Sequence, residues 1–318
     1  MKLTHLLAAG ALALSTGLAA APAQADEFIN VLTGGTSGVY YPLGAALAKI
    51  YGEKIPGVRT QVQSTKASVE NLNLLQQGRG EIAFALGDSV RDAWAGNEEA
   101  GFKKKLDKLR AIAAIYPNYI HLVARADSGI RSLADLKGRN ISVGVLKSGT
   151  ELNARAIFAA AGLTYRNFGK VQYLPFGESV ELMKNRQLDA TLQSAGLGAS
   201  SLRDLATSVD IVVVPIPADV IRKTHDPAYL PATIPANTYR GQTGDVHTAA
   251  VQNFLVTREE VGIDIVYGMT KALWTNLDQL AAAHSAAKAI DLKHALDGML
   301  LPLHPGAEKY YKEVGIIK

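Results

Sequence analysis

The feature that most constrains the fold is a repeated alternation of short apolar strands and helices, in which the strands end in loops rich in glycine or hydroxyl groups. Residues 28–32, 59–62 and 82–86 are three such strands, and helical patterns separate them. The first strand runs directly into a glycine-rich turn at residues 33–38. Three strands that alternate with helices within about sixty residues predict a parallel, doubly wound α/β layer.

The second half of the chain repeats this plan. Further strands are expected at residues 109–115, 120–124, 141–145, 171–174, 190–193 and 211–216. A proline-marked stretch at residues 227–244 is expected to be irregular, and residues 248–257 are expected to form a strand that returns to the first layer. The remainder of the chain is expected to be helical, with breaks at Pro302 and Pro305.

Two similar α/β layers predict a clamshell of two lobes that closes on a small solute. Ligands of open α/β sheets bind beyond the carboxyl ends of the strands, so the loops of both lobes are expected to face one cleft. We expect residues 26–120 and 248–318 to form lobe I and residues 121–247 to form lobe II. The chain would then bend at a hinge near residues 120–124 and 245–250.

The first 25 residues are expected to be a signal peptide and not part of the fold. Lys2 provides a positive start, residues 6–20 are mostly apolar, and Ala23-Gln24-Ala25 has small residues at the positions that a signal peptidase reads. The alternative is an uncleaved membrane anchor, which would need a longer span of about 20 apolar residues. We therefore expect cleavage after Ala25 and export of the mature chain.

The 318-residue chain contains no cysteine. This excludes a cysteine nucleophile, a cysteine zinc site, an iron–sulfur cluster, a disulfide and a lipidated N-terminal cysteine. Because a lipid tether on cysteine is excluded, we expect the exported protein to diffuse freely in the periplasm of a Gram-negative bacterium.

The formal net charge of +4 is dispersed along the chain. The only dense basic run is at residues 103–105, and Asp107 follows it closely. A surface that tracks phosphates would need a basic stripe with interleaved aromatic residues, which this sequence does not have. We expect no nucleic-acid partner.

Catalytic and metal motifs do not occur in the sequence. The histidines lack metal-ligand spacing, and neither H-E-x-x-H nor a G-x-S-x-G nucleophile elbow is found. A Ser-x-x-Lys match at Ser285 and Lys288 has no accompanying K-T-G or S-D-N, and we interpret it as chance. We expect no catalytic residue, no metal and no cofactor.

The candidate solute-binding residues lie in the strand-end loops. Glycines let the backbone approach a ligand, and hydroxyls with N–H groups at a helix start suit a small anion. Ser64 and Thr65 have a second interpretation as helix caps, and Asp88 is either a cap or an acceptor for a ligand ammonium. The candidates are Gly35, Thr36, Ser37, Tyr40, Ser64, Thr65, Ser68, Asn71, Asp88, Ser148, Gly149, Thr150, Gln193, Ala195 and Gly196.

Four segments resemble, in the same order, the TAXI family of solute-binding proteins, which are the extracytoplasmic components of TRAP transporters. These segments are GGTSGVYYPLG at residues 34–44, SGTELNAR at 148–155, IPANTY at 234–239 and PLHPGAEKYYKE at 302–313. The resemblance implies a two-lobed periplasmic binding protein fold of type II, the Venus-flytrap kind, with a hinge between two doubly wound α/β domains. It also implies that the candidate residues above form the pocket.

The resemblance further implies capture of a small organic acid or amino acid, typically glutamate or glutamine. Delivery would be to TRAP membrane permease subunits, fused or separate, and driven by an ion gradient. Many relatives resemble Gln-Ser-Asp where this chain has Leu86-Gly87-Asp88. Fewer acceptors then remain for an ammonium, which favours a dicarboxylate or a 2-oxo acid.

We therefore expect a monomeric transport receptor for a small anionic or zwitterionic solute, and not an enzyme. One alternative is a periplasmic enzyme that acts on a small anionic substrate in a cleft of the same fold. Another is a surface adhesin, which would leave the paired strand-end loops unexplained.

Overall fold

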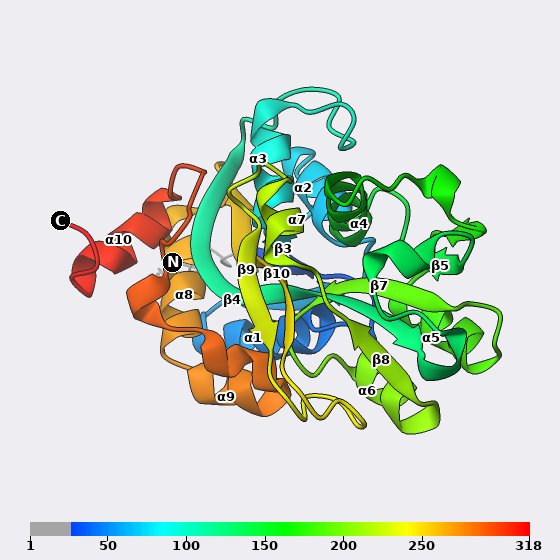
Figure 1. Ribbon diagram of the computed structural model, residues 1–318. Helices are drawn as coiled ribbons and strands as arrows, with labels where there is room; N and C mark the ends of the chain where they lie inside the picture. The colour runs from blue at the N-terminus through cyan, green and yellow to red at the C-terminus, as the bar shows by residue number, and fades with distance from the viewer. Residues whose placement is uncertain (1–26) are drawn as a thin grey trace, which may run out of the picture.

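The computed structural model describes residues 27–318 (Figure 1). The predicted signal peptide and its cleavage after Ala25 lie outside the described residues. Within residues 27–318, no helix is long and apolar enough to cross a membrane.

The described strands form one continuous sheet, in the order β2-β1-β3-β10-β4-β7-β5-β6, with β8 beside β4 and β9 beside β10. The first three strands are parallel, and so are β5, β6 and β7, whereas β4 and β10 run antiparallel to their neighbours. The strands are β1 (Glu27–Leu32), β2 (Val58–Gln63), β3 (Ile82–Leu86), β4 (Leu109–Arg125), β5 (Asn140–Ser142), β6 (Lys170–Gln172), β7 (Ala190–Ala195), β8 (Ile211–Val214), β9 (Leu230–Ile234) and β10 (Val246–Arg258).

Helices flank the sheet, and several of them start shortly after a strand ends. The α-helices are α1 (Tyr40–Lys54), α2 (Ser68–Gln76), α3 (Gly87–Ala95), α4 (Gly149–Ala160), α5 (Phe176–Lys184), α6 (Ser200–Ser208), α7 (Ala218–Arg222), α8 (Ile263–Trp274), α9 (Leu277–Ala283) and α10 (Pro305–Glu313). Short 3-10 helices are η1 (Ala126–Ser128), η2 (Leu133–Leu136), η3 (Tyr165–Asn167), η4 (Ser285–Ala289) and η5 (Leu292–His294). The predicted alternation of strands and helices is therefore present in both halves.

The two lobes share the long strands β4 and β10. Residues 109–119 of β4 pair with β10, and from Tyr119 onward the same strand pairs with β7 and β8. Similarly, β10 pairs with β4 and β3 through its second half and with β9 from Val246 to Ala250. Each strand therefore passes from one lobe into the other without a break.

Two predictions for this region are wrong. Residues 109–115 and 120–124 belong to one strand, β4, although Pro117 lies within it. The β4–β10 register shifts between Gln252 and Phe254, and Pro117 faces Gln252 at that irregularity, where a missing N–H is tolerated. Within the stretch predicted to be irregular, β9 forms because it pairs with the edge of β10.

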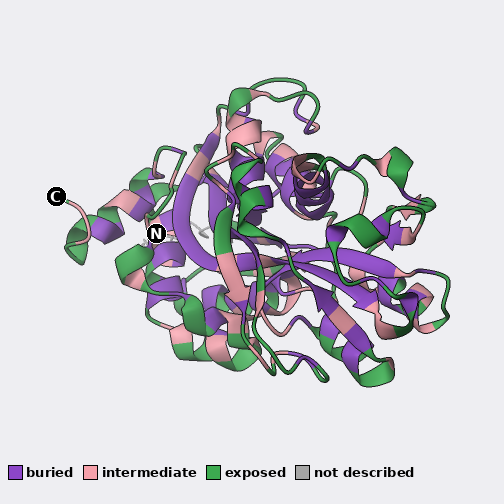
Figure 2. Cartoon of the chain, in the orientation of Figure 1, coloured by how far each residue is buried: buried purple, intermediate pink, exposed green. Residues whose placement is uncertain are grey.

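The hydrophobic core is divided along the same lines. Ile29, Leu47 and Phe84 lie in the largest cluster, most of which belongs to lobe I, whereas Ile141 and Phe158 lie in a separate cluster, most of which belongs to lobe II. All five side chains are 1% exposed or less, and burying each stabilises the fold by about 1.5–3 kcal/mol. Figure 2 shows the buried strands of the sheet, in purple, at the centre and the exposed faces of the helices, in green, on the outside.

The C-terminal helix α10 packs against α8 through a glycine. His304 caps α10 by accepting a hydrogen bond from the N–H of Gly306 (3.1 Å), and Pro305 occupies the first helical position, where proline is tolerated. A Cβ atom on Gly306 would lie 2.3 Å from the carbonyl oxygen of Ile263 and 2.6 Å from the nitrogen of Tyr267. The two backbones are thus in direct contact.

We expect Gly306→Ala to lower the free energy of unfolding by about 2 kcal/mol, because helix backbones must move apart to admit the methyl group. Gly52→Ala is the matched control. Gly52 also lies in a helix, but its Cβ would meet nothing closer than 3.5 Å, so alanine should stabilise by up to about 1 kcal/mol. Urea unfolding of both variants measures these changes, and equal effects would contradict the close packing.

Candidate functional site

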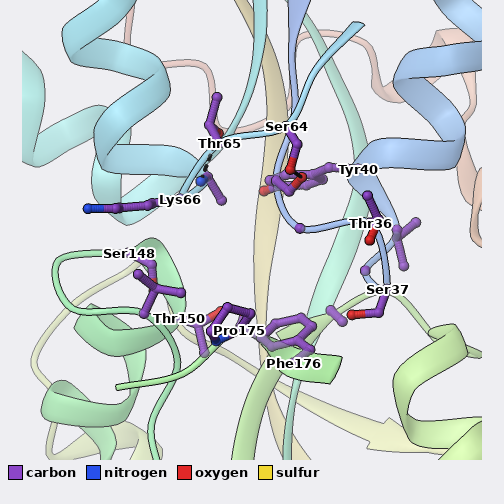
Figure 3. Close-up of a pocket in the computed structure, with 18 of the residues that line it drawn as sticks. Thr36, Ser37, Tyr40, Ser64, Thr65, Lys66, Ser148, Thr150, Pro175 and Phe176 are labelled. Atoms are coloured by element: carbon purple, nitrogen blue, oxygen red, sulfur yellow. Dashed lines mark hydrogen bonds between the residues drawn. The ribbon is translucent and has the colours of Figure 1, made fainter. Parts of the chain in front are cut away.

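A cavity of about 500 Å³ lies between the two lobes, where the strand-end loops meet (Figure 3). The loop before α1 and the loop before α2 form its lobe I wall, and the loops before α4 and α5 form its lobe II wall. Most of the predicted site residues line this cavity. They are Gly35, Thr36, Ser37, Tyr40, Ser64, Thr65, Ser68, Ser148, Thr150 and Ala195.

Four helices begin at the cavity wall: α1, α2, α4 and α5. The first N–H groups of a helix have no partner inside the helix, and the N-terminus carries a partial positive charge. At α1, α2 and α5 no capping side chain accepts from these groups, whereas Ser148 accepts from Glu151 N at α4 (3.2 Å). At three of the four helix N-termini around the cavity, the N–H donors are therefore not occupied by a capping side chain.

The charged side chains of the cavity wall are Lys66 and Glu178, and both are exposed. The rest of the wall combines small hydroxyl side chains with apolar groups such as Leu86, Val145 and Phe176. Since the described wall contains no buried carboxylate or guanidinium, its electrostatic character comes from the helix N-termini. Such a wall suits a small anion.

The hydroxyl groups of the wall fall into two kinds. Ser64 Oγ donates to Gly34 O (2.9 Å), and Thr65 Oγ1 donates to Thr33 O (2.9 Å), so both hold the loop together. The interpretation of Ser64 and Thr65 as helix caps is wrong, because α2 starts later, at Ser68.

Hydroxyl groups of the second kind are not engaged elsewhere. In residues 27–318, the hydroxyls of Thr36, Ser37 and Thr150 have no hydrogen bond. Ser194 Oγ is buried and also has no partner in this part of the chain. A buried hydroxyl without a partner costs free energy, so Ser194 favours a polar occupant of the cavity. The hydroxyls of Thr36, Ser37 and Thr150 are free to donate to such an occupant.

The floor of the cavity is a chain of side-chain hydrogen bonds that crosses the sheet. The hydroxyl of Tyr40 on α1 donates to Asn253 Oδ1 on β10. Asn253 Nδ2 donates to Asn118 Oδ1 (2.8 Å), and Asn118 Nδ2 donates to Ser194 O (3.0 Å). Burial raises the pKa of Tyr40, which keeps its hydroxyl protonated as the donor. The chain links lobe I, both shared strands and lobe II.

The structure places other predicted site residues behind the wall. Asn71 is buried and donates to Thr33 O (2.7 Å) and Phe84 O (2.8 Å), so it fixes the ends of two strands. Gln193 accepts from Ser201 Oγ (2.7 Å). A Cβ atom on Gly149 would clash with Ser68 and Leu86. A Cβ atom on Gly196 would clash with Tyr116 and Ala286.

Asp88 is also outside the cavity wall. It is 2% exposed and accepts hydrogen bonds from Asn153 Nδ2 (2.6 Å), from the Tyr229 hydroxyl (2.9 Å) and from Ser89 N (2.7 Å). With its carboxylate occupied by three protein donors, Asp88 is not placed to accept from an ammonium group in the cavity.

Sequence reasoning missed several wall residues. Residues 175–178 follow β6 and begin α5, so the strand-end rule that selected the other loops also applies to them. Asn118 is a lone amide in an apolar strand, which is a recognisable signal. Val39, Leu86 and Val145 carry no signal, because apolar residues in such positions are indistinguishable from core.

Ala67 has a strained backbone at the cavity wall. Its φ of 67° and ψ of −143° lie in a region that is open to glycine but costly for residues with a Cβ atom. This conformation turns the chain into α2 next to the cavity.

We expect Ala67→Gly to raise the free energy of unfolding by about 1 kcal/mol, because relief of strain exceeds the added entropy of the unfolded chain. Ala159→Gly is the matched control, since Ala159 is exposed on α4 with helical geometry and the same change there should lower stability by about 1 kcal/mol. Thermal or urea unfolding measures both. A loss of stability at position 67 would show that the conformation is not strained.

Burial raises the pKa of Asp88 to about 6, from an ordinary value of 3.8. The folded state therefore binds this proton more tightly than the unfolded state does. The contribution of Asp88 to the free energy of unfolding is greatest below about pH 4 and falls by about 3 kcal/mol as the pH rises through 6.

Asp88→Asn removes this titration. The difference in unfolding free energy between the original protein and the variant should change by about 2 kcal/mol between pH 4 and pH 7, as followed by urea unfolding. A constant difference over this range would show that the folded-state pKa of Asp88 is ordinary.

The chain matches the model of the NMT1-like family over residues 31–315. PhnD1 from Prochlorococcus marinus, in complex with methylphosphonate, is similar in structure, with 12% identity, a TM-score of 0.57, and coverage of 92% of this chain and 100% of that chain. A binding protein component of an ABC phosphonate transporter from Pseudomonas aeruginosa has 11% identity and a TM-score of 0.55, covering 84% and 80% of the two chains. A putative L-cystine ABC transporter protein from Listeria monocytogenes has 16% identity and a TM-score of 0.51, covering 85% and 98%.

These findings correct the predicted family. The expectation of a TAXI protein of a TRAP transporter is wrong, because the matching family model is NMT1-like and the similar structures include proteins of ABC transporters. Glycine- and hydroxyl-rich strand-end loops are needed by any fold that binds an anion there, so such motifs do not identify one family.

Two of these three structures, those from Pseudomonas aeruginosa and Listeria monocytogenes, are named as transporter components, which agrees with the expectation of a non-enzymatic protein. Their likeness at this level of identity concerns the fold, and it confirms the predicted two-lobed α/β architecture. The chain therefore belongs to the NMT1-like family and has the fold of periplasmic solute-binding proteins.

Proposed function

We propose that this chain is the solute-binding protein of an ABC-type transporter, and that it captures a small anion in the cavity between its lobes and delivers it to a membrane permease. The observation that carries the proposal is the convergence of four helix N-termini on a cavity of about 500 Å³, three of them without a capping side chain. Donors arranged in this way bind anions by hydrogen bonds and by the partial charge of the helix ends.

The relatives support an anionic solute. PhnD1 from Prochlorococcus marinus is in complex with methylphosphonate, and the Pseudomonas aeruginosa protein is a component of a phosphonate transporter. An alkanesulfonate-binding protein from Xanthomonas axonopodis, with 15% identity and a TM-score of 0.51, is bound to the sulfonate MOPS. Phosphonates and sulfonates are small anions rich in acceptor oxygens, as the donors of this cavity require.

The wall favours a plain anion over an amino acid. An amino-acid ligand has an ammonium group, which is best stabilised by a buried carboxylate among its hydrogen-bond acceptors. Asp88, the predicted acceptor, lies outside the wall and is occupied by protein donors, and Glu178 is exposed. The free hydroxyls of Thr36, Ser37 and Thr150 are donors that an anion can use.

Closure of the lobes follows from the shared strands. We place the hinge where β4 changes partner at Tyr119 and where β10 changes partner at Ala250, close to the predicted lobe boundaries at 120/121 and 247/248. Bending there would bring the loops of lobe II onto a solute bound to lobe I. We also propose that the receptor is monomeric and is located in the periplasm.

A thermal-shift screen of carboxylates, sulfonates and phosphonates tests the function. A specific anion at 100 times its Kd should add about 2.7 kcal/mol of stability and raise the Tm by about 5 °C. If none of the three classes raises the Tm, the proposed function is wrong. Conversion of the added anion to a product during incubation would instead indicate an enzyme.

The double variant Ser37→Ala, Thr150→Ala should weaken binding of the selected anion about 100-fold while leaving the Tm of the solute-free protein within about 2 °C. Each hydroxyl would lose a hydrogen bond to a charged group, and neither has a partner in the described chain to lose. Thr65→Ala is the contrasting control, because its hydroxyl contacts Thr33 O and Asn71 Oδ1 and its removal should lower stability. Calorimetric titration and thermal unfolding separate the two effects.

A further inference from the structure

Asp88 joins the two lobes at a place away from the cavity. It lies in the first turn of α3 in lobe I, whereas Asn153 lies on α4 and Tyr229 precedes β9, both in lobe II. The carboxylate accepts from Asn153 Nδ2 (2.6 Å) and from the Tyr229 hydroxyl (2.9 Å), and Asn153 Nδ2 also donates to that hydroxyl (3.0 Å). We name these three residues the interlobe cluster.

The interlobe cluster is excluded from solvent. Asp88 is 2% exposed, Asn153 is fully buried and Tyr229 is 5% exposed. Within the described chain Asn153 Oδ1 has no hydrogen-bond partner, so the cluster contains an unsatisfied buried acceptor as well as a buried carboxyl. Removal of one partner would leave a further buried polar group unsatisfied, so the contacts within the cluster hold the two lobes together once they have formed.

A second polar contact joins the same two elements. Arg91, one turn after Asp88 on α3, forms an ion pair with Asp226, which precedes Tyr229 in the chain. Arg91 also contacts Asp92 on its own helix (3.3 Å). The cluster and this ion pair form a continuous line of contact between α3 and the segment before β9.

The interlobe cluster lies beside the hinge and not in the solute cavity. Gly87, the residue before Asp88, packs against β10, where an added Cβ would lie 2.9 Å from the Phe254 ring and 3.4 Å from Gln252 O. None of the three cluster residues lines the cavity. Because Asp88 belongs to lobe I and its two partners belong to lobe II, a change in the angle between the lobes would alter these contacts without involving a residue of the cavity wall.

We propose that Asp88, Asn153 and Tyr229 form an interlobe latch that favours the closed arrangement of the lobes and thereby raises the affinity for the solute. The effect on affinity rests on the proposed function, since it requires a solute that binds between the lobes. When only the closed state binds tightly, the apparent Kd equals the intrinsic Kd divided by the closed fraction. The three residues act as positioning residues without touching the solute.

The latch can be tested without any solute. Since the chain has no cysteine, the pair Ala45→Cys on α1 and Ala159→Cys on α4 places spin labels at exposed positions, one in each lobe. Tyr229→Phe is the decisive variant because it removes one oxygen atom and keeps the ring. Asp88→Asn is a second variant, which sets an amide N–H₂ among the donors of the cluster.

In the solute-free protein, both variants should shift the distribution of distances between the labels to longer values, with at least a threefold rise in the fraction of open molecules. Ser142→Ala is the matched control, because the buried contact of Ser142 Oγ with Ser179 Oγ (2.7 Å) lies within lobe II and its loss should leave the distances unchanged. If folded Tyr229→Phe and Asp88→Asn proteins give the original distance distribution, the latch does not exist.

Titration with methylphosphonate separates failure of the latch from failure of the proposed function. If the variants open and their Kd is at least threefold higher than that of the original protein, the latch and the proposed function are both supported. If the variants open but the protein binds none of the anions in the thermal-shift screen, the latch is supported and its proposed effect on affinity is wrong. Unchanged distances in a protein that binds an anion remove only the latch.

Discussion

The antiparallel pairing of β4 with β10 is the interaction on which the other parts of the structure depend. Their shared backbone hydrogen bonds are buried in the middle of the sheet, where exchange with water is unfavourable. Because both strands also pair with lobe II, the two lobes are held in one sheet. The loops of both lobes consequently face a common space.

The chemistry of that space follows from the parallel strands. Strands β1, β2, β5 and β6 are followed by the helices α1, α2, α4 and α5, whose N-termini lie at the cavity wall, so N–H groups from both lobes surround one volume. Small side chains at these turns leave the N–H groups accessible. The proposed binding of an anion would therefore need no buried cation in the wall, and the cost of burying an unpaired charge would be avoided.

Asp88 and Asn118 show how far a sequence can specify such a site. The loops at residues 34–40 and 148–150 could be selected from sequence because glycine and hydroxyl residues at a strand end let the backbone approach a ligand and offer donors to it. Asp88 has the same sequence context, yet α3 begins immediately at Gly87 and turns the carboxylate toward Asn153 and Tyr229. Asn118 reaches the cavity floor only because β10 and β7 hold it there. The family was mistaken for a similar reason, since loop motifs that share one task look alike.

The sequence by itself determined the alternation of strands and helices, the two-lobed class of fold and the loops that meet between the lobes, because these depend on local periodicity and on residues with special backbone preferences. Only the tertiary structure decided that β4 is one strand through Pro117, that β9 forms at an edge and that Asp88 bridges the lobes instead of facing a solute. These outcomes depend on partners far away in the chain, and the contacts of Asp88 with Asn153 and Tyr229 exist only after both lobes have folded against the shared strands.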